Sequence, residues 1–346
     1  MMPLSLDGEK IKGIPAHSDY TIGWICVYQV ELDAALAMLD TTHGTLPGTP
    51  DDSNTYTLGR IYDFNVVVGY HQTNDKWPNR AATLASNMKR TFPSIQLYMV
   101  VGVGSGIGDG STMPGNLPPA NGEMDLRLGD VVVGTMATQF SLEQTAEGDR
   151  FRQVGATRTI PERFASALSR LYWFHESEAN AIPALLALMV EEFPAMESYA
   201  WRQGRHDWLF SSTYEHVGST ESCEQCDKAN LVQRSSLYGT GPLIHRGLIV
   251  SGYQAMRRAS ARDQLARDLK GLCIDNDAAE MMDEFPCVFI RGICDYSDSH
   301  AQGNKEWWPY AAATSAAFAK ELLWIMEIPE EYSVDPATSP ANNPTR

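Results

Sequence analysis

The sequence has few basic residues for its length. Lysine and arginine together number 27, aspartate and glutamate 43, and the formal net charge is −16. A surface of this sign repels a phosphate backbone, so we expect no nucleic-acid partner. A small anionic ligand stays possible because backbone amides can bind it locally.

Long apolar runs are also missing, since no stretch reaches the roughly 20 residues that a membrane span needs. We therefore expect no membrane partner. Residues 1–18 lack the basic start and apolar run of a secretory signal, and we expect them to form an N-terminal extension. Residues 331–346 are rich in proline, asparagine, serine and threonine, which predicts a disordered tail.

Cysteine is scarce, with six residues in a chain of 346. So few thiols do not build a disulfide framework in a chain of this size, and we expect them to be reduced. This pattern predicts a cytoplasmic location.

Between the two ends, strand and helix patterns alternate over residues 19–330. Apolar, β-branched runs predict strands at 20–28, 56–61, 64–70, 97–103, 129–133, 247–251, 271–274 and 286–294. Helical spacing predicts helices at 31–39, 80–90, 162–172, 182–192, 259–269, 277–283 and 310–326. We therefore predict a single α/β domain with a central, mostly parallel mixed sheet flanked by helices.

Ligands of such sheets bind beyond the carboxyl ends of the strands. This rule brings four loops together as site candidates, and they follow Tyr28, Val103, Ile274 and Ile293. The chain interrupts the alternation twice, at residues 108–122 and at about 203–241.

Two carboxylates stand at predicted strand ends. Asp295 ends the apolar strand 286–294, where partial desolvation would raise its pKa and suit it to general acid catalysis. A helix cap is the alternative role, which aspartate fills well. Glu31 opens the first predicted helix, where the helix dipole alone would favour an acid.

A glycine-rich turn follows the strand 97–103. Its residues Gly102, Val103, Gly104 and Ser105 place backbone amides where an anion or a sugar can approach. The turn matches neither a dinucleotide fingerprint nor a Walker loop.

Three polar residues, Asp275, Asn276 and Asp277, join a short strand to the next helix. Either aspartate can accept hydrogen bonds from vicinal sugar hydroxyls, and either can instead cap the helix.

Cys223 and Cys226 form a Cys-x-x-Cys pair, with His206 and His216 upstream. The spacing is partly that of a zinc site, but a zinc ribbon would show a second pair. The sequence favours a flexible, thiol-bearing loop here, with no metal and no organic cofactor, and His300 is interpreted as an ordinary polar position.

Several blocks of the chain together resemble the nucleoside phosphorylase and nucleosidase superfamily, specifically its fungal branch, which is often fused to repeat or immune-receptor-like proteins. These blocks are residues 20–26 with Glu31 and Leu32, then 53–60, 126–133, 206–210, 247–252, 285–300, 310–314 and 319–323. The resemblance covers about residues 18–328.

The resemblance implies roles for the two carboxylates. Asp295 falls on the aspartate that protonates or hydrogen-bonds the purine N7 and so helps the base to leave. Glu31 falls on the glutamate that activates the attacking water in nucleosidases. The segment around Gly102, Gly104 and Gly106 falls on the loop that cradles this water or a phosphate.

The resemblance also implies a pocket for base and sugar. Ser251 and Gly252 lie beside the base, Tyr253 can stack on it, and Asp277 falls on a glutamate that holds the ribose hydroxyls. Further substrate-binding candidates from the same motifs are Val103, Ser105, Asp275, Asn276, Arg291 and Cys294.

The resemblance favours water over phosphate as the nucleophile. Phosphorylases of this fold bring arginines to the phosphate, and Gln29, Val30 and residues 99–101 stand at those positions here. We therefore expect an N-glycosidic hydrolase of a purine nucleoside or nucleotide, a small-molecule substrate, and a homodimer as is usual for the fold.

The ribose motif departs from the family pattern, in which an acid one methylene longer stands at Asp277 and a methionine at Asn276. The shorter arm retracts the carboxylate by about 1.5 Å. Ser105 also replaces a usual glycine. Three alternatives therefore stay open: a divergent enzyme with altered substrate or chemistry in a specialised biosynthetic pathway, a phosphate-dependent phosphorylase, and a non-catalytic sensor module.

Overall fold

A computed structural model describes residues 14–49, 52–70, 80–107, 125–145, 148–202, 204–218, 222–234, 241–252 and 256–327. The expected extension up to residue 13, the expected tail, the insertion at 108–122 and Tyr253 lie outside the described residues. No helix in the described ranges combines the length and the apolar character needed to cross a membrane.

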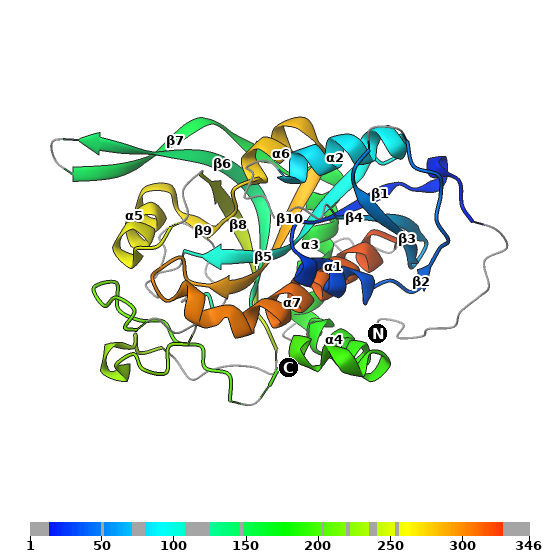
Figure 1. The fold of residues 1–346 in the computed structure, drawn as a ribbon. Helices are drawn as coiled ribbons and strands as arrows, with labels where there is room; N and C mark the ends of the chain where they lie inside the picture. The colour runs from blue at the N-terminus through cyan, green and yellow to red at the C-terminus, as the bar shows by residue number, and fades with distance from the viewer. Residues whose placement is uncertain are drawn as a thin grey trace, which may run out of the picture.

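The described chain contains the alternating elements that the sequence predicts (Figure 1). The strands are β1 (Ile22–Cys26), β2 (Thr41–Thr42), β3 (Thr55–Ile61), β4 (Phe64–Tyr70), β5 (Leu97–Gly106), β6 (Val131–Thr145), β7 (Gly148–Thr159), β8 (Ile244–Ser251), β9 (Gly271–Ile274) and β10 (Cys287–Asp295). The α-helices are α1 (Gln29–Leu36), α2 (Arg80–Thr91), α3 (Glu162–Ser177), α4 (Ile182–Glu192), α5 (Ala259–Leu269), α6 (Ala278–Glu284) and α7 (Trp308–Glu327). Short 3-10 turns are η1 (His17–Asp19), η2 (Pro194–Tyr199), η3 (Lys228–Asn230) and η4 (Ala301–Trp307).

All these strands belong to one mixed sheet with the order β10-β6-β8-β9-β5-β1-β4-β3-β2, and β7 pairs with β6 outside this path. Strands β10, β5, β1 and β4 run parallel to one another at its centre. Because β10 also pairs with β5, the strands β5, β9, β8, β6 and β10 close into a ring. The predicted α/β class with a mixed sheet is confirmed, and the closed ring is a feature that the sequence did not suggest.

The central strands are apolar because the sheet is covered on both faces. Every residue of β1 and of β10 is buried. Helices α2 and α6 lie on one side of the sheet and α7, α1 and α4 on the other (Figure 1). Such two-sided burial produces continuous apolar runs rather than alternation.

Helix α7 is the central support of the sheet. Its residues from Tyr310 to Ile325 are all buried, and it packs on β10, β5, α1, α3 and α4. Its alanine-rich face allows close approach: a Cβ added to Gly292 of β10 would lie 1.8 Å from the Ala311 carbonyl oxygen.

One prediction was incomplete. The sequence predicts a strand only at 129–133, but β6 and β7 form a long antiparallel hairpin that extends away from the body of the molecule (Figure 1). The two strands of the hairpin pair with each other, which holds their polar residues in strand conformation. No apolar run in the sequence therefore marks them as strands. A further short strand, β2, was also missed.

Candidate active site

The candidate site lies at the carboxyl end of β5. β5 pairs there with β10, where Ser105 is opposite Asp295, and with β9, where Ser105 is opposite Ile274. The start of α1, directly after β1, reaches the same end of the sheet because the Val103 amide donates to Glu31. The four predicted loops therefore meet at one end of β5.

Glu31 is held in a fixed orientation. One carboxylate oxygen, Oε2, accepts hydrogen bonds from the amides of Val27 (2.7 Å) and Tyr28 (3.0 Å). The other, Oε1, accepts one from the Val103 amide (2.9 Å). The first two bonds belong to the start of α1, as the helix-dipole alternative predicts, but the third ties the carboxylate to β5. Both roles thus apply to Glu31.

Gly102 gives Glu31 its space. A Cβ built on Gly102 would lie 1.9 Å from Glu31 Oε1, far closer than any real contact. Glycine is therefore required here by close approach, because only a residue without a side chain leaves room for the carboxylate.

Arg291 lies between two carboxylates. Its guanidinium is 2.7 Å from Asp275 Oδ2 and 3.9 Å from Glu31 Oε1, and its side chain is 2% exposed. The neighbouring carboxylates raise the pKa of Arg291 against the effect of burial, so the group stays charged. Arg291 was expected among the substrate-binding residues; in this structure its charge is directed at Asp275 and Glu31.

Burial raises the pKa of Glu31, while Arg291 and the three backbone donors oppose the rise. Desolvation penalises the charged form, and the donors favour it. A carboxylate with a raised pKa is a better general base, and the fixed geometry directs its remaining lone pairs.

Asp295 is the second buried carboxylate, with 6% of its surface exposed. Its Oδ1 accepts from the Ser297 amide (2.9 Å), and its Oδ2 accepts from the Ser105 hydroxyl (3.1 Å) and the Cys294 thiol (3.4 Å). Burial raises the pKa of Asp295, opposed by the donors of Ser297 and Ser105. A carboxyl group with a raised pKa is suited to donate a proton near neutral pH.

Ser105 and Cys294 therefore act on Asp295, although both were expected to bind substrate. The Cys294 thiol also contacts the Gly104 carbonyl oxygen at 3.5 Å. A Cβ on Gly104 would meet the Cys273 sulfur at 2.6 Å, so this glycine too is placed by close packing.

Two of the residues expected beside the base, Ser251 and Gly252, lie in the described part of the chain. Ser251 is buried, and its hydroxyl accepts from the Ala279 amide (3.0 Å), which fixes the start of α6. Gly252 is buried against the ring of Phe140, which a Cβ would meet at 2.4 Å. Sequence reasoning missed Phe140, because it lies in the unpredicted part of β6.

Asp275, Asn276 and Asp277 lie between β9 and α6, close to Val250 of β8. Asp275 pairs with Arg291 and accepts from the Asp277 amide (2.9 Å). The Asp277 side chain does not hydrogen-bond to the first turn of α6, which argues against the capping alternative. Asn276 is exposed.

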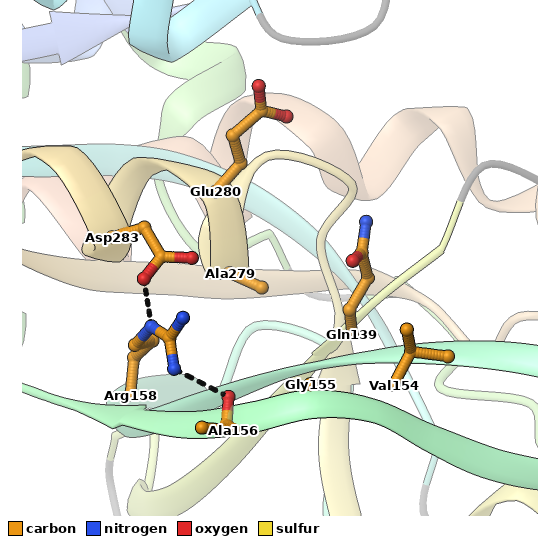
Figure 2. Close-up of a pocket in the computed structure, with 8 residues that line it drawn as sticks. All are labelled: Gln139, Val154, Gly155, Ala156, Arg158, Ala279, Glu280 and Asp283. Atoms are coloured by element: carbon orange, nitrogen blue, oxygen red, sulfur yellow. Dashed lines mark hydrogen bonds and ion pairs between the residues drawn. The ribbon is translucent and has the colours of Figure 1, made fainter.

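A cavity of about 250 Å³ opens beside α6, at the base of the hairpin of β6 and β7 (Figure 2). Its lining residues are Gln139, Val154, Gly155, Ala156, Arg158, Ala279, Glu280 and Asp283. None of them is a site residue predicted from the sequence, and the cavity contains neither Glu31 nor Asp295. We therefore locate the candidate site by its paired carboxylates and not by this cavity.

The thiol-bearing segment differs from the expected flexible loop. Cys223 and Cys226 are each 3% exposed and lie beside His216, whereas His206 is exposed and stacks on Trp208.

The solved structures with this fold include nucleosidases and a futalosine hydrolase. The 5'-methylthioadenosine/S-adenosylhomocysteine nucleosidase of Neisseria meningitidis, in complex with methylthio-immucillin-A, matches with a TM-score of 0.53 and 16% identity over 88% of this chain and 98% of that one. A putative nucleosidase of the same type from Borrelia burgdorferi, bound to adenine, gives 0.52 and 16% over 88% and 99%. Futalosine hydrolase of Helicobacter pylori gives 0.50 and 15% over 89% and 99%.

The chain therefore has the fold of these nucleosidases, and the fold implied by the resemblance in the sequence is confirmed. No family model matches the sequence. A nucleotide-binding leucine-rich repeat (NLR)-like protein of Hyaloscypha variabilis is 34% identical over 323 residues. The match covers 90% of this chain but 30% of that protein, so the chain spans about a third of its relative's length.

Proposed function

We propose that the protein hydrolyses the N-glycosidic bond of a purine nucleoside or nucleotide. The observation that carries the proposal is the pair Glu31 and Asp295, which come from α1 and the end of β10, are both buried, and both meet β5 near its carboxyl end. Carboxyl groups with raised pKa values supply a base and an acid at one site.

In the proposed reaction, Asp295 donates a proton to the leaving purine at N7. The bond between the base and the sugar breaks as positive charge develops on the sugar ring, and the buried carboxylates stabilise this charge. Glu31 removes a proton from the attacking water as the new bond to oxygen forms. Gly102 and Val103 set the position of Glu31, and Ser105 and Cys294 set that of Asp295.

The sugar would lie toward Asp277. The family pattern implies this sugar-binding role for Asp277, which stands at the start of α6 without capping it. The base would lie near Ser251 and Gly252, beside the ring of Phe140.

Water is the proposed nucleophile rather than phosphate. A phosphate would meet the charge of Glu31, and the guanidinium of Arg291 beside it is already directed at Glu31 and Asp275. We further propose that the protein works as a cytoplasmic homodimer, without a metal or organic cofactor in the reaction.

The test is a chromatographic assay for released base. Purified protein is incubated with adenosine, inosine, guanosine, methylthioadenosine and ATP, with and without phosphate. Release without phosphate, lost in Asp295→Asn and Glu31→Gln, supports hydrolysis. Asp63→Asn is the matched control, because Asp63 is exposed in the turn after β3. Release that depends on phosphate would instead make the protein a phosphorylase.

A second candidate function rests on the NLR-like relative, in which the matching region is one part of a longer protein. The same site would then bind a nucleoside as a signal without cleaving it. Saturable binding of a nucleoside, measured by calorimetry, with no release of base from any substrate above would favour this function over hydrolysis.

A further inference from the structure

A cluster of soft metal ligands lies outside the candidate active site, in the segment between α4 and β8. Phe210 and Leu231 form an isolated β-bridge there. Phe210 also packs with Cys223 and Cys226 in a small buried core of its own. Two buried thiols side by side therefore lie within a small, well-packed unit.

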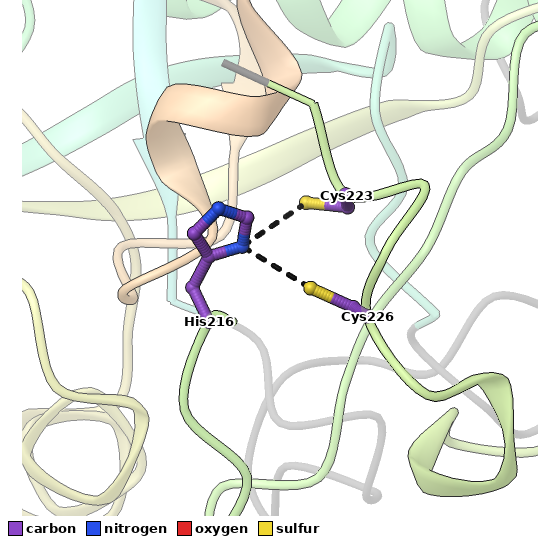
Figure 3. Close-up of side chains that lie close together, drawn as sticks. All are labelled: His216, Cys223 and Cys226. Atoms are coloured by element: carbon purple, nitrogen blue, oxygen red, sulfur yellow. Dashed lines mark hydrogen bonds between the residues drawn. The ribbon is translucent and has the colours of Figure 1, made fainter. Parts of the chain in front are cut away.

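The ligand atoms of this cluster have the spacing of a tetrahedral site (Figure 3). His216 Nδ1 lies 3.2 Å from Cys226 Sγ and 3.9 Å from Cys223 Sγ, and the three atoms lie within 4.8 Å of one another. Zinc bound at about 2.3 Å to sulfur and 2.1 Å to nitrogen separates such ligands by roughly 3.6 Å. The observed distances fall on either side of that value.

A fourth potential ligand comes from the loop after β10. The His300 side chain is 2% exposed, and neither of its ring nitrogens has a hydrogen-bond partner among the described residues. Its ring centroid is 5.4 Å from that of His216. Buried imidazoles normally satisfy their polar atoms, so two unsatisfied nitrogens beside a thiol pair need an explanation.

The surroundings of His300 suit a metal ligand. Its Nδ1 lies 3.7 Å from Asp298 Oδ1, and Asp298 is held in turn by Arg262 at 3.2 Å. Histidines that bind a metal through one nitrogen commonly present the other to a carboxylate. With Nδ1 on the side of Asp298, Nε2 is the nitrogen left for a metal.

We propose that His216, Cys223, Cys226 and His300 bind a structural zinc ion, with His300 as the fourth ligand after a small rotation of its side chain. Two thiolates and two imidazoles in a closed tetrahedral set are typical of structural zinc, which needs no open position. His300 is 77 residues away from Cys223 in the sequence, and only the fold brings the two residues together. The sequence pattern therefore showed one Cys-x-x-Cys pair without the remaining ligands of a zinc site.

The zinc would tie this segment to the loop that directly follows Asp295. The His216 amide donates to Ser299 Oγ (3.0 Å), and the Cys223 thiol lies 3.9 Å from the His300 carbonyl oxygen. Asp295 is the last residue of β10, five residues before His300. The ion is therefore expected to stabilise the position of the loop and to take no part in the reaction.

The first test is the zinc content of the full chain, purified without chelator and measured by mass spectrometry after gel filtration. We expect about one zinc ion per chain. His216→Ala should lower the content at least tenfold, whereas His206→Ala, in the exposed histidine of the same segment, should leave it unchanged. His216→Cys replaces one zinc ligand by another and should restore binding.

The second test keeps the proposal falsifiable if the variants fold poorly. Cobalt added to metal-free wild-type protein should give the intense absorption of thiolate-bound tetrahedral cobalt, and His300→Ala should change its position. Wild-type protein with less than about a tenth of a zinc ion per chain, before and after zinc is added and desalted, would overturn the proposal. So would an intact Cys223–Cys226 disulfide in a metal-free protein.

Discussion

The substitution Gly102→Ala should move the Glu31 carboxylate without changing its chemical identity, so it tests the position of this residue alone. The added methyl carbon would lie 1.9 Å from Oε1 and 2.1 Å from the carboxyl carbon of Glu31. To reach even 3.0 Å, the shortest distance that real contacts approach, the carboxylate must retreat by about 1.1 Å. It cannot do so without stretching its bonds to the amides of Val27, Tyr28 and Val103.

A displacement of this size costs on the order of a hundredfold in rate, or about 2.7 kcal/mol of transition-state stabilisation. We expect kcat for base release to fall by that factor while the protein stays folded, because overpacking costs only about 1–3 kcal/mol of stability. The assay is initial-rate chromatography well below the midpoint of thermal unfolding.

Gly48→Ala is the control for this experiment, because a Cβ there meets nothing within 4 Å. It should leave the rate unchanged. A Gly102→Ala protein that keeps its rate within about threefold of wild type, a difference of about 0.6 kcal/mol, would refute the placement of Glu31 as the base.

The buried charges of the site give four more predictions. Asp295→Asn should lower the rate of base release by roughly 10²–10⁴-fold, the range for loss of a general acid, in the same chromatographic assay. Burial raises the pKa of Asp295 in the native protein. Wild-type stability should therefore fall as pH rises through that pKa, because the native state resists ionisation of this group. Asp295→Asn has no such ionisation, so its melting temperature relative to that of wild type should increase with pH above about 4. The rate should fall on the acid side as Glu31 is protonated and on the alkaline side as Asp295 is deprotonated, and an acid limb that persists unchanged in a variant lacking Glu31 would contradict that assignment. Arg291→Met should cost about 3–5 kcal/mol in urea unfolding, because Glu31 and Asp275 lose their buried counter-charge; a loss below 1 kcal/mol would show that these carboxylates are neutral.

The sequence predicted the central elements well because their buried residues form apolar runs or helically spaced apolar positions. Helices α4 and α5 and strand β9 have the predicted bounds, and β5 and β10 differ by a few residues. The site loops were placed by a rule of topology, and Glu31 and Asp295 do meet at β5.

What the sequence could not show depends on pairing between distant segments. The closed ring depends on the pairing of β10 with both β5 and β6, and the outer half of β6 has no apolar pattern to mark it. The bond of Arg291 to Asp275 and the contact of His300 with the thiol-bearing segment join residues far apart in the chain. Local composition carries no signal for either.

The contact of Gly292 with Ala311 has a consequence for how the protein tolerates mutation. The backbone of β10 rests directly on helix α7 three residues before Asp295, with no side chain between them to adjust. A larger residue at either position must move the whole strand end, and with it the carboxyl group. Positions on α7 that no ligand touches are thus expected to be among the least permissive in a mutational scan of activity. Changes in substrate specificity during evolution would then arise in the loops around the site, while β10 and α7 stay unchanged.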